Sequence, residues 1–468
     1  MKTLGNVTAT AEQLTVIDNP APGFWLIRGA AGSGKTTTAL LRLKFLVRYW
    51  RERRADLGLE APVRVLVLTF NRTLRGYVAE LAEQQIPSDA EVDLEISTFG
   101  FWSKQLLGQV LLESGPQSLA LKRFAGDRFP WTDDFLLSEV NYVLGLYMPD
   151  ERSRYMRAER TGRGRSPTVE RGEVRQRLIS EVIEPYEAWK RDRGVVDWND
   201  LAVELAHVRH TDPYDIVVVD EAQDFSANQI RAVVNHLADE FVCTFIRDTT
   251  QRIYPNVFVW RDLGISFPAN QSRRLQTNYR NTKEIAAFAR PLVEGIEGIE
   301  DDNLPDFTGC VREGPLPVVL RGRYQGQLGW AMDYLRSGRV GPDETVAFVH
   351  PKGGGWFSTL RNRLDAEGLA WTSLTRAMDW PSGDEQIALL TMHSAKGLEF
   401  DHVILLGYNA EVVQHGAEPG DVMLDSHRRL LAMAVGRARQ QFVVGYKPSD
   451  ASRLVEFLDP GTFEAVEV

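Results

Sequence analysis

Short apolar runs rich in β-branched residues alternate with longer helix-forming stretches along most of the chain. Such alternation is typical of α/β domains built on parallel sheets. The candidate strands of the first half are Phe24–Arg28, Val63–Phe70, Val92–Ser97, Ile216–Val219 and Phe241–Ile246. Those of the second half are Pro317–Leu320, Thr345–Val349, Ile387–Met392, His402–Leu406 and Gln441–Tyr446. The pattern predicts an α/β fold with two lobes, each formed around a parallel sheet of about five strands.

The segment from about Phe101 to Leu201 breaks this alternation. It is rich in leucine, arginine, glutamate and tryptophan at helical spacing and carries no clear strand run. We therefore expect a mainly helical insertion within the first lobe. The first lobe then comprises residues 1–100 and 202–274, the insertion residues 101–201, and the second lobe residues 275–468.

A glycine-rich loop follows the first candidate strand. Residues 29–36 read GAAGSGKT, which matches G-x-x-x-x-G-K-[ST], and they open a predicted helix. In such a loop the backbone N–H groups converge on phosphate oxygens, and the helix N-terminus adds partial positive charge. Lys35 is expected to reach the β- and γ-phosphates, and the Thr36 hydroxyl to hold Mg²⁺. The predicted binding residues are Gly29, Gly32, Ser33, Gly34, Lys35, Thr36 and Thr37.

A later apolar strand, Ile216–Val219, ends in the adjacent carboxylates Asp220 and Glu221. At the carboxyl edge of a parallel sheet, Asp220 suits a contact to Mg²⁺. Glu221 is then placed to polarise an attacking water. The alternative role for such a pair is a helix N-cap, but the glycine-rich loop favours the nucleotide site.

Composition limits the choice of function without deciding it. The chain has 468 residues and a net charge of −10, which disfavours a nucleic-acid partner overall. Local charge matters more, and residues 151–177 hold nine arginines against four acids, 9 − 4 = +5. That run is either a solvated helical face or arm, or a border for nucleic acid.

Two further features concern the compartment. No apolar stretch approaches the roughly 20 residues that span a bilayer, and the N-terminus lacks an apolar signal core. Cys243 and Cys310 form no CxxC pair. This argues against a zinc site or a disulfide framework, and we expect a cytoplasmic protein without a membrane partner.

With GAAGSGKT and DEAQD (220–224) in place, the chain resembles superfamily 1A helicases of the UvrD/Rep/PcrA type. The resemblance implies two RecA-like P-loop NTPase lobes, 1A and 2A, with a 1B-like subdomain at the helical insertion. AEQ at 11–13 looks like the Q motif, which implies that Gln13 reads adenine. DTTQRIY at 248–254 is similar to motif III, and Gln251 would sense the γ-phosphate.

The second lobe carries three more such motifs. LQTNYR at 275–280 looks like motif IV, which implies that Tyr279 stacks on adenine and Arg280 reaches the γ-phosphate. LTMHSAKGLEF at 390–400 resembles motif V, with Glu399 near the ribose, and RRLLAMAVGRAR at 428–439 resembles motif VI, with Arg437 as a second arginine finger. An arginine from a facing lobe neutralises charge on the transferred phosphoryl group only when the lobes close. Closure and hydrolysis would thereby be coupled.

A motor of this type must grip a strand without reading its sequence, which aromatic platforms and phosphate contacts achieve. VLTFN at 67–71 resembles motif Ia and STF at 97–99 resembles motif Ib, which implies stacking by Phe70 and a phosphate contact by Thr98. The nucleic-acid contacts implied in this way are Phe70, Asn71, Thr98, Phe99, Tyr254, Trp260 and His393. For any single aromatic among them, a place in the core is the alternative.

The sequence also departs from the family pattern. Thr37 stands where an arginine often packs on the base, Gly100 where a histidine is common, and Gly436 where a threonine is common. In motif III, Trp260 lies four residues farther from Gln251 than in the type pattern. From Arg280 to Thr391 there are about 110 residues, which leaves no room for the 2B insertion of full-length members.

The resemblance implies an ATP- and Mg²⁺-dependent 3′→5′ single-stranded DNA translocase or helicase. The missing 2B subdomain leaves open a motor subunit that acts only with a partner, such as a nuclease in DNA repair or phage defence. A nucleotide-gated switch without translocation is a third hypothesis, which the intact Glu221, Arg280 and Arg437 argue against. RNA in place of DNA leaves no readable motif.

Overall fold

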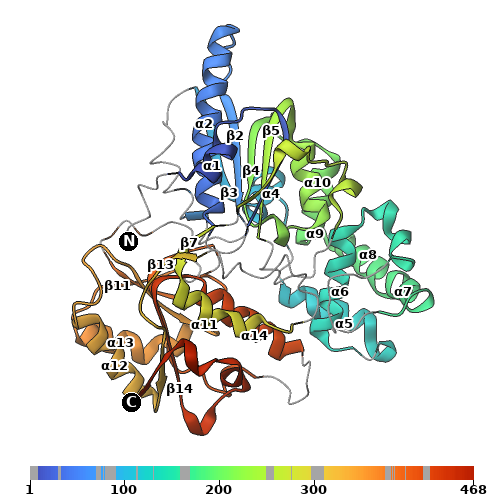
Figure 1. Ribbon diagram of the computed structural model, residues 1–468. Coiled ribbons are helices and arrows are strands. Elements are labelled where there is room, and N and C mark those ends of the chain that lie inside the picture. Colours follow the sequence, from blue (N-terminus) through green and yellow to red (C-terminus); the bar gives the residue numbers. More distant parts are fainter. Residues whose placement is uncertain are drawn as a thin grey trace.

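The computed structural model shows two α/β lobes and a cluster of helices beside the first (Figure 1). It describes residues 9–29, 33–69, 75–76, 79, 91–111, 114–129, 131–158, 169–248, 258–275, 277–296, 310–374, 381, 383, 385–395, 397–414 and 422–468. Within these ranges, none of the helices has the length and apolar character needed to traverse a lipid bilayer.

The first lobe is a six-stranded parallel sheet in the order β3-β2-β4-β5-β1-β6. Its strands are β1 (Gly23–Gly29), β2 (Val63–Thr69), β3 (Val92–Thr98), β4 (Tyr214–Val219), β5 (Leu237–Asp248) and β6 (Ser272–Leu275). Its helices are α1 (Ala11–Ile17), α2 (Lys35–Asp56), α4 (Phe99–Leu107), α9 (Trp198–His207) and α10 (Ala227–Asn235).

Helices cover both faces of this sheet, which is why its strands read as continuous apolar runs. Along β1, Trp25 and Ile27 join the core that includes α2, whereas Leu26 joins the core of α4, α9 and α10. The alternation follows the two-residue period of a strand. Because every strand is parallel, the loops after β1 and β4 meet at one carboxyl edge.

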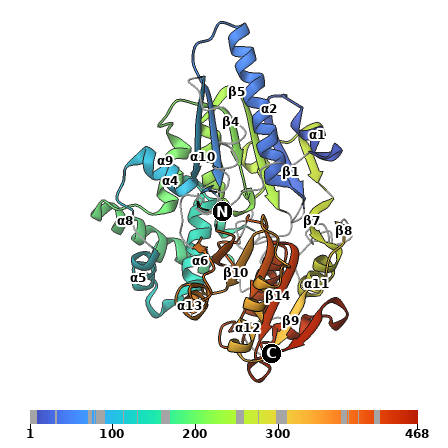
Figure 2. The same ribbon diagram turned by 90° about the vertical axis from the view of Figure 1, so that its left-hand side faces the viewer.

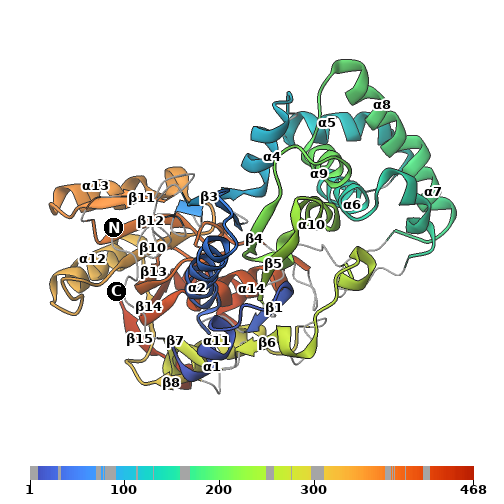
Figure 3. The ribbon, with the colours of Figure 1, turned by 90° about the horizontal axis from the view of Figure 1, so that it is seen from above.

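The predicted helical segment has a core of its own. It contains α5 (Ser114–Ala125), α6 (Asp133–Leu146), α7 (Glu173–Leu178) and α8 (Glu184–Arg193), with a π-helical turn at Ile179–Ile183. Leu121, Val140, Val182 and Tyr186 are buried together there. Figures 2 and 3 show these helices gathered beside α9 and α10 of the first lobe.

Three of the described arginines of the basic run make contacts within the helical segment. Arg152 pairs with Glu187, and Arg177 donates to Glu181 at 2.9 Å. Arg175 is 2% exposed and donates to the carbonyl oxygens of Tyr155 and Ala158, each at 2.7 Å. These side chains are engaged in intramolecular contacts, and residues 159–168 of the run lie outside the described ranges.

The second lobe is a seven-stranded parallel sheet in the order β11-β12-β10-β13-β14-β9-β15. Its strands are β9 (Val318–Arg321), β10 (Val346–His350), β11 (Trp371–Ser373), β12 (Ile387–Thr391), β13 (Phe400–Leu405), β14 (Ala438–Tyr446) and β15 (Glu464–Glu467). A pair formed by β7 (Asn278–Thr282) and β8 (Cys310–Arg312) lies beside it. Its helices are α11 (Lys283–Val293), α12 (Tyr324–Arg336), α13 (Ser358–Ala366) and α14 (Val422–Val435).

The ten strands expected from the sequence are all present, and the α/β prediction with two parallel sheets is confirmed. The structure adds β6, β11 and β15 to the two sheets, and all three are edge strands. The residues of β11 and β15 are partly or fully exposed. Such strands lack an apolar run because one side faces solvent. β11 and β12 are joined by residues 374–386 alone, which is too short to contain another domain.

A buried arginine fastens the N-terminal helix to the rest of the lobe. Arg42 on α2 is fully buried and donates to the carbonyl oxygens of Val16 at 2.5 Å and Asn19 at 2.6 Å. Its guanidinium lies 3.9 Å from the centroid of the Trp25 ring. Burial lowers the pKa of Arg42 to about 9.

We predict that Arg42→Ala lowers the free energy of unfolding by about 2–4 kcal/mol, because two buried carbonyls lose their donor and a cavity opens beside Trp25. Urea unfolding followed by circular dichroism measures this change. Arg48→Ala on the exposed face of the same helix is the control, and it should leave the midpoint unchanged. Equal midpoints for both variants would contradict the anchoring role.

Candidate functional site

A pocket of about 400 Å³ lies where the two lobes meet. Both lobes contribute to its lining, which consists of Gly34, Lys35, Thr36, Thr37, Asp220, Glu221, Ile246, Arg280, Gly397, Glu399 and Arg437. The structure thus brings together the predicted phosphate loop, the carboxylate pair and both predicted arginine fingers.

Glycines at two positions fit the backbone and packing of the phosphate loop. Gly34, the N-cap of α2, has a φ of 74°, in the left-handed region that favours glycine. A Cβ on Gly29 would lie 2.5 Å from the Ser33 hydroxyl and 2.8 Å from the Leu275 carbonyl oxygen. Lys35 turns back to donate to the Gly29 carbonyl at 2.9 Å. The N-terminus of α2 therefore faces the pocket, as an anion site requires; Gly32 lies outside the described residues.

The predicted Mg²⁺ ligands are adjacent. The Thr36 hydroxyl donates to the Asp220 carboxylate at 2.9 Å. Burial, and then the nearby Glu221, raises the pKa of Asp220 well above that of an ordinary aspartate. A carboxylate and a hydroxyl oxygen fit Mg²⁺, which takes few protein ligands and completes its shell with phosphates and water. A bound cation would offset the cost of keeping Asp220 ionised.

Glu221 is held in a strained conformation. Its φ of 54° is the one positive value found for a non-glycine residue within the described ranges. Such strain persists at functional sites where neighbouring contacts enforce it. Here the Glu221 N–H donates to Asp220 at 2.8 Å, and the Gln223 amide donates to the Glu221 carboxylate. The carboxylate therefore has a fixed direction before any substrate binds.

On the second lobe, Arg280 is bound to a carboxylate of the same lobe. Its guanidinium pairs with Glu399 and also donates to the Gly436 carbonyl at 3.3 Å. Burial alone would raise the pKa of Glu399, but Arg280 together with Arg439 and Arg437 lowers the pKa overall. Arg437 is 2% exposed and donates to the Met433 carbonyl at 3.2 Å. In this structure the Glu399 carboxylate is paired with Arg280. The sequence resemblance implied a position near the ribose.

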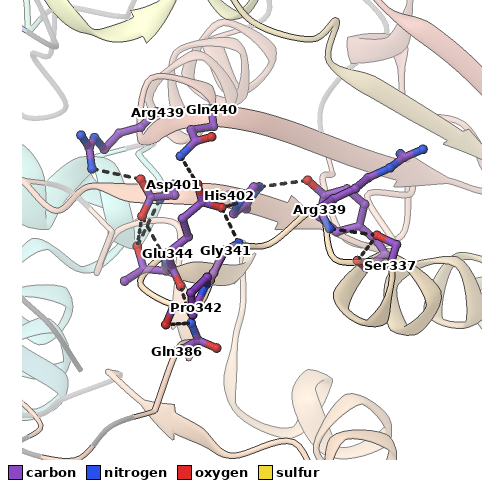
Figure 4. Close-up of polar contacts among 12 residues, drawn as sticks. Ser337, Arg339, Gly341, Pro342, Glu344, Gln386, Asp401, His402, Arg439 and Gln440 are labelled. Carbon is purple, nitrogen blue, oxygen red and sulfur yellow. Dashed lines mark hydrogen bonds and ion pairs between the residues drawn. The ribbon is translucent and has the colours of Figure 1, made fainter.

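A polar network braces the sheet edge that carries these groups (Figure 4). Glu344 contacts His402 at 2.8 Å and also accepts from Gln440. Asp401 accepts from Arg439 at 3.0 Å and from the backbone of Thr345 at 2.9 Å. Because Asp401 follows Glu399 by two positions and Arg439 follows Arg437 by two, the network fixes the strand starts from which both pocket residues project.

Gln13 lies beside the phosphate loop. It is 3% exposed, and a Cβ on Gly34 would lie 2.6 Å from its amide nitrogen. Its amide oxygen accepts from the Thr10 N–H at 3.0 Å, as part of the capping box of α1. The amide oxygen is therefore already engaged. Gln251 and the side chain of Tyr279, the other predicted nucleotide contacts, lie outside the described residues.

The predicted strand contacts divide into three groups. His393 is exposed, while Phe70, Asn71 and Tyr254 lie outside the described ranges. Thr98 is 7% exposed, and its hydroxyl caps the N-terminus of α4 by accepting from the Phe101 N–H at 3.3 Å. Thr98 therefore has a structural task besides any phosphate contact.

Two aromatic rings take part in packing. Phe99 is 5% exposed and packs edge-on against Trp102 and Phe225. Its ring belongs to the core, so the expected nucleic-acid contact by Phe99 is wrong for the side chain. Trp260 is half-buried, with its ring centroid 4.7 Å from that of Phe245 and 5.3 Å from that of Phe267. Packing thus occupies part of the ring that was expected to stack on bases.

Sequence reasoning missed the partner of Gly100. A Cβ on Gly100 would lie 2.8 Å from the ring of Trp198, which is itself 41% exposed at the start of α9. The Trp198 ring thus occupies the space that a side chain at position 100 would need. The contact joins segments almost one hundred positions apart in the sequence, so no local sequence pattern predicts it.

The Arg280–Glu399 pair leads to a prediction about stability. Glu399→Gln removes the carboxylate that a buried guanidinium needs, and we expect the melting temperature of the nucleotide-free protein to fall by roughly 2–6 °C. With a non-hydrolysable ATP analogue and Mg²⁺ the fall should be smaller, because phosphate oxygens give Arg280 another partner. Differential scanning fluorimetry measures both states. Glu313→Gln, in an exposed pair with Lys283, is the control, and equal falls in both states would contradict the exchange of partners.

The sequence is similar to known helicases over most of its length. Residues 9–262 match the UvrD/REP helicase N-terminal domain, and residues 363–449 match the UvrD-like helicase C-terminal domain. A probable DNA helicase of Mycoplasma pneumoniae is 24% identical over 475 aligned positions, which cover 93% of this chain and 84% of that protein. The ATP-dependent DNA helicase UvrD2 of Mycobacterium tuberculosis is 26% identical over 330 positions, covering 62% of this chain but only 44% of the relative.

One solved structure is also similar. The C-terminal domain of a possible DNA helicase from Lactobacillus plantarum has 20% sequence identity and a TM-score of 0.31, covering 40% of this chain and 99% of that one.

Proposed function

The chain belongs to the UvrD/Rep helicase family, and from this premise we propose that it is an ATP- and Mg²⁺-dependent motor that moves 3′→5′ along single-stranded DNA. One observation carries the proposal: groups for phosphoryl transfer from the first lobe line the same pocket as two arginines of the second. The DNA track is supported by the family and by relatives whose names are those of DNA helicases. The 3′→5′ direction rests on the resemblance alone.

The first lobe supplies the groups that act on the triphosphate. The backbone N–H groups of the loop and the N-terminus of α2 hold phosphate oxygens, and Lys35 exchanges the Gly29 carbonyl for a phosphate. Thr36 and Asp220 would hold Mg²⁺, which neutralises charge on the β- and γ-phosphates. Glu221, fixed by its contacts, orients the water that attacks the γ-phosphorus and accepts its proton.

The second lobe supplies the charge that completes the site. Arg280 leaves Glu399 for the γ-phosphate, and Arg437 approaches from the neighbouring turn. Both arginines stabilise the negative charge that develops as the phosphoryl group transfers. Once phosphate has left, Glu399 is again the best partner for Arg280. Binding and hydrolysis therefore alternately draw the lobes together and release them, which moves the strand contacts of one lobe relative to the other.

A second candidate is a motor that separates duplexes only together with a partner protein. The observation that favours it is the direct connection of β11 to β12 through residues 374–386, where the second lobe has no inserted domain to hold a duplex. In this case the chain alone translocates along the single strand, but it separates duplex strands only with the partner. We propose that the partner is a nuclease.

We predict that single-stranded DNA stimulates ATP hydrolysis and that Glu221→Gln lowers the stimulated rate by about 100-fold or more, because the water loses its base. A coupled-enzyme ATPase assay with DNA and RNA oligonucleotides measures this and identifies the preferred track. Glu456→Gln, on an exposed side chain, should behave as wild type. Stimulation should weaken as salt rises, because phosphate contacts release counterions. An ATPase indifferent to either nucleic acid would support the nucleotide-gated switch instead.

The two candidates differ in duplex unwinding. If the chain is a translocase that needs a partner, the purified protein should displace streptavidin from a biotinylated single strand but leave a 3′-tailed duplex intact. Substrates with a 3′ single-stranded tail should be compared with substrates that have a 5′ tail. A 3′→5′ motor can use only the substrates with a 3′ tail or a free 3′ segment. Robust unwinding by the chain alone would eliminate the obligatory partner.

A further inference from the structure

Arg439 is a third arginine close to the Glu399 carboxylate. The parallel strands β13 and β14 start in register, with Phe400 opposite Ala438. Glu399 stands one position before the first of these residues, and Arg439 one position after the second. Arg439 donates to the carboxylate of Asp401 on β13 at 3.0 Å (Figure 4). Its guanidinium therefore lies at the same strand starts as Glu399.

The charge of Arg439 acts on Glu399 directly. Burial raises the pKa of Glu399, whereas Arg280, then Arg439 and then Arg437 lower it. Arg439 thus has a larger effect on this carboxylate than Arg437, which lines the nucleotide pocket. No motif recognised in the sequence assigns a role to Arg439.

The exchange of partners by Arg280 leaves a carboxylate behind. The side chains of Arg280 and Glu399 are only 10% and 17% exposed. A carboxylate with so little access to water stays ionised only when nearby cations or donors compensate for the lost hydration. Under the proposed function, Arg280 and Arg437 both turn to the γ-phosphate when nucleotide binds. A ribose hydroxyl could then donate a hydrogen bond to Glu399, but it would bring no charge.

Arg439 is placed to remain with Glu399 during this exchange. It is not among the residues that line the nucleotide pocket, so a bound triphosphate does not compete for it. Its partner Asp401 also accepts from the Thr345 N–H at 2.9 Å and from the Thr345 hydroxyl at 3.1 Å. Asp401 therefore keeps hydrogen-bond donors if Arg439 shifts, and the five N–H donors of a guanidinium can serve two carboxylates at once.

We propose that Arg439 is a positioning residue that compensates the charge of Glu399 whenever nucleotide holds Arg280. The inference rests on the proposed function, because it presumes that bound nucleotide draws Arg280 away from its own lobe. With Arg439 in place, Glu399 remains ionised in both states. Arg280 can then change partners without a proton having to enter the pocket.

Removal of Arg439 should therefore couple nucleotide binding to a proton. The charged groups around Glu399 are Arg280 from β7, Arg437 and Arg439 at the start of β14, Asp401 on β13, and Lys35, Asp220 and Glu221 across the pocket. Without Arg439, binding would change Glu399 from a paired carboxylate to a buried, unpaired one and would thus raise its pKa. Binding would then take up a proton and would strengthen as the pH falls.

The test is binding of a non-hydrolysable ATP analogue with Mg²⁺ to Arg439→Gln. Isothermal titration calorimetry in buffers of different ionisation enthalpy measures both the affinity and the number of protons taken up. We expect the affinity to be about 5- to 50-fold below that of wild type near pH ~8 and closer to it near pH ~6. We also expect the uptake of up to about one proton more than in wild type.

Four further variants separate the charge of Arg439 from its place in the network. Arg439→Lys keeps the charge and should bind nearly as wild type, without an additional proton. Asp401→Asn keeps the cation and loses only its present partner, so it should cause neither effect. Glu399→Gln combined with Arg439→Gln removes the uncompensated carboxylate and should abolish the additional proton. Arg453→Gln, from an exposed pair with Glu456, is the surface control.

Three results would overturn the proposal. The first is wild-type affinity and proton uptake in Arg439→Gln. The second is an equal loss of affinity in Arg439→Gln and Asp401→Asn without an additional proton, which would show that this pair only braces the strands. The third is the same additional proton in Arg439→Lys. DNA-stimulated ATP hydrolysis by wild type tests the proposed function separately, so the failure of one is distinguishable from the failure of the other.

Discussion

One mostly buried ion pair on the second lobe organises the pocket between the lobes. Arg280 is mostly buried and pairs with Glu399 on its own lobe. Leaving such a group unpaired costs several kcal/mol, so it moves only when another anion takes over. The phosphate loop, Thr36 and Asp220 place a triphosphate binding site across the pocket from it. Under the proposed function, Glu399 pairs with Arg280 in the free state and a phosphate pairs with it in the bound state, so that the nucleotide would control how the lobes associate.

Other contacts hold the groups around the pocket in place while Arg280 exchanges Glu399 for a phosphate. Glu221 is fixed in a left-handed conformation by Asp220 and Gln223, so its carboxylate needs no reorganisation. The network around Glu344 and Asp401 ties neighbouring strands of the second sheet together next to the arginines (Figure 4). Helices cover both faces of each sheet, and one buried apolar cluster continues from the first lobe into the second.

The two lobes offer different chemistry to a strand. In the first lobe, the Thr98 hydroxyl caps a helix and the Phe99 ring is core, while Trp198 covers Gly100. In the second lobe, the predicted strand contact His393 is exposed. Among the described residues, the first lobe's predicted contacts Thr98 and Phe99 are thus occupied by helix capping and packing, whereas that of the second lobe faces outward.

The sequence alone determined the features that depend on local pattern. Buried parallel strands are apolar on both faces, so all ten predicted strands are found, and the loop GAAGSGKT is identifiable because phosphate binding fixes its spacing. The sequence pattern did not predict edge strands β11 and β15, because strands with one side exposed to solvent lack a continuous apolar run. Only the tertiary structure decided that Phe99 is core, that Trp198 fills the space above Gly100 and that Glu399 pairs with Arg280. The Arg280–Glu399 and Gly100–Trp198 contacts join residues that are distant in sequence. The Phe99 ring could face either the core or the solvent. Local sequence patterns decide neither case, because both depend on how the folded chain packs.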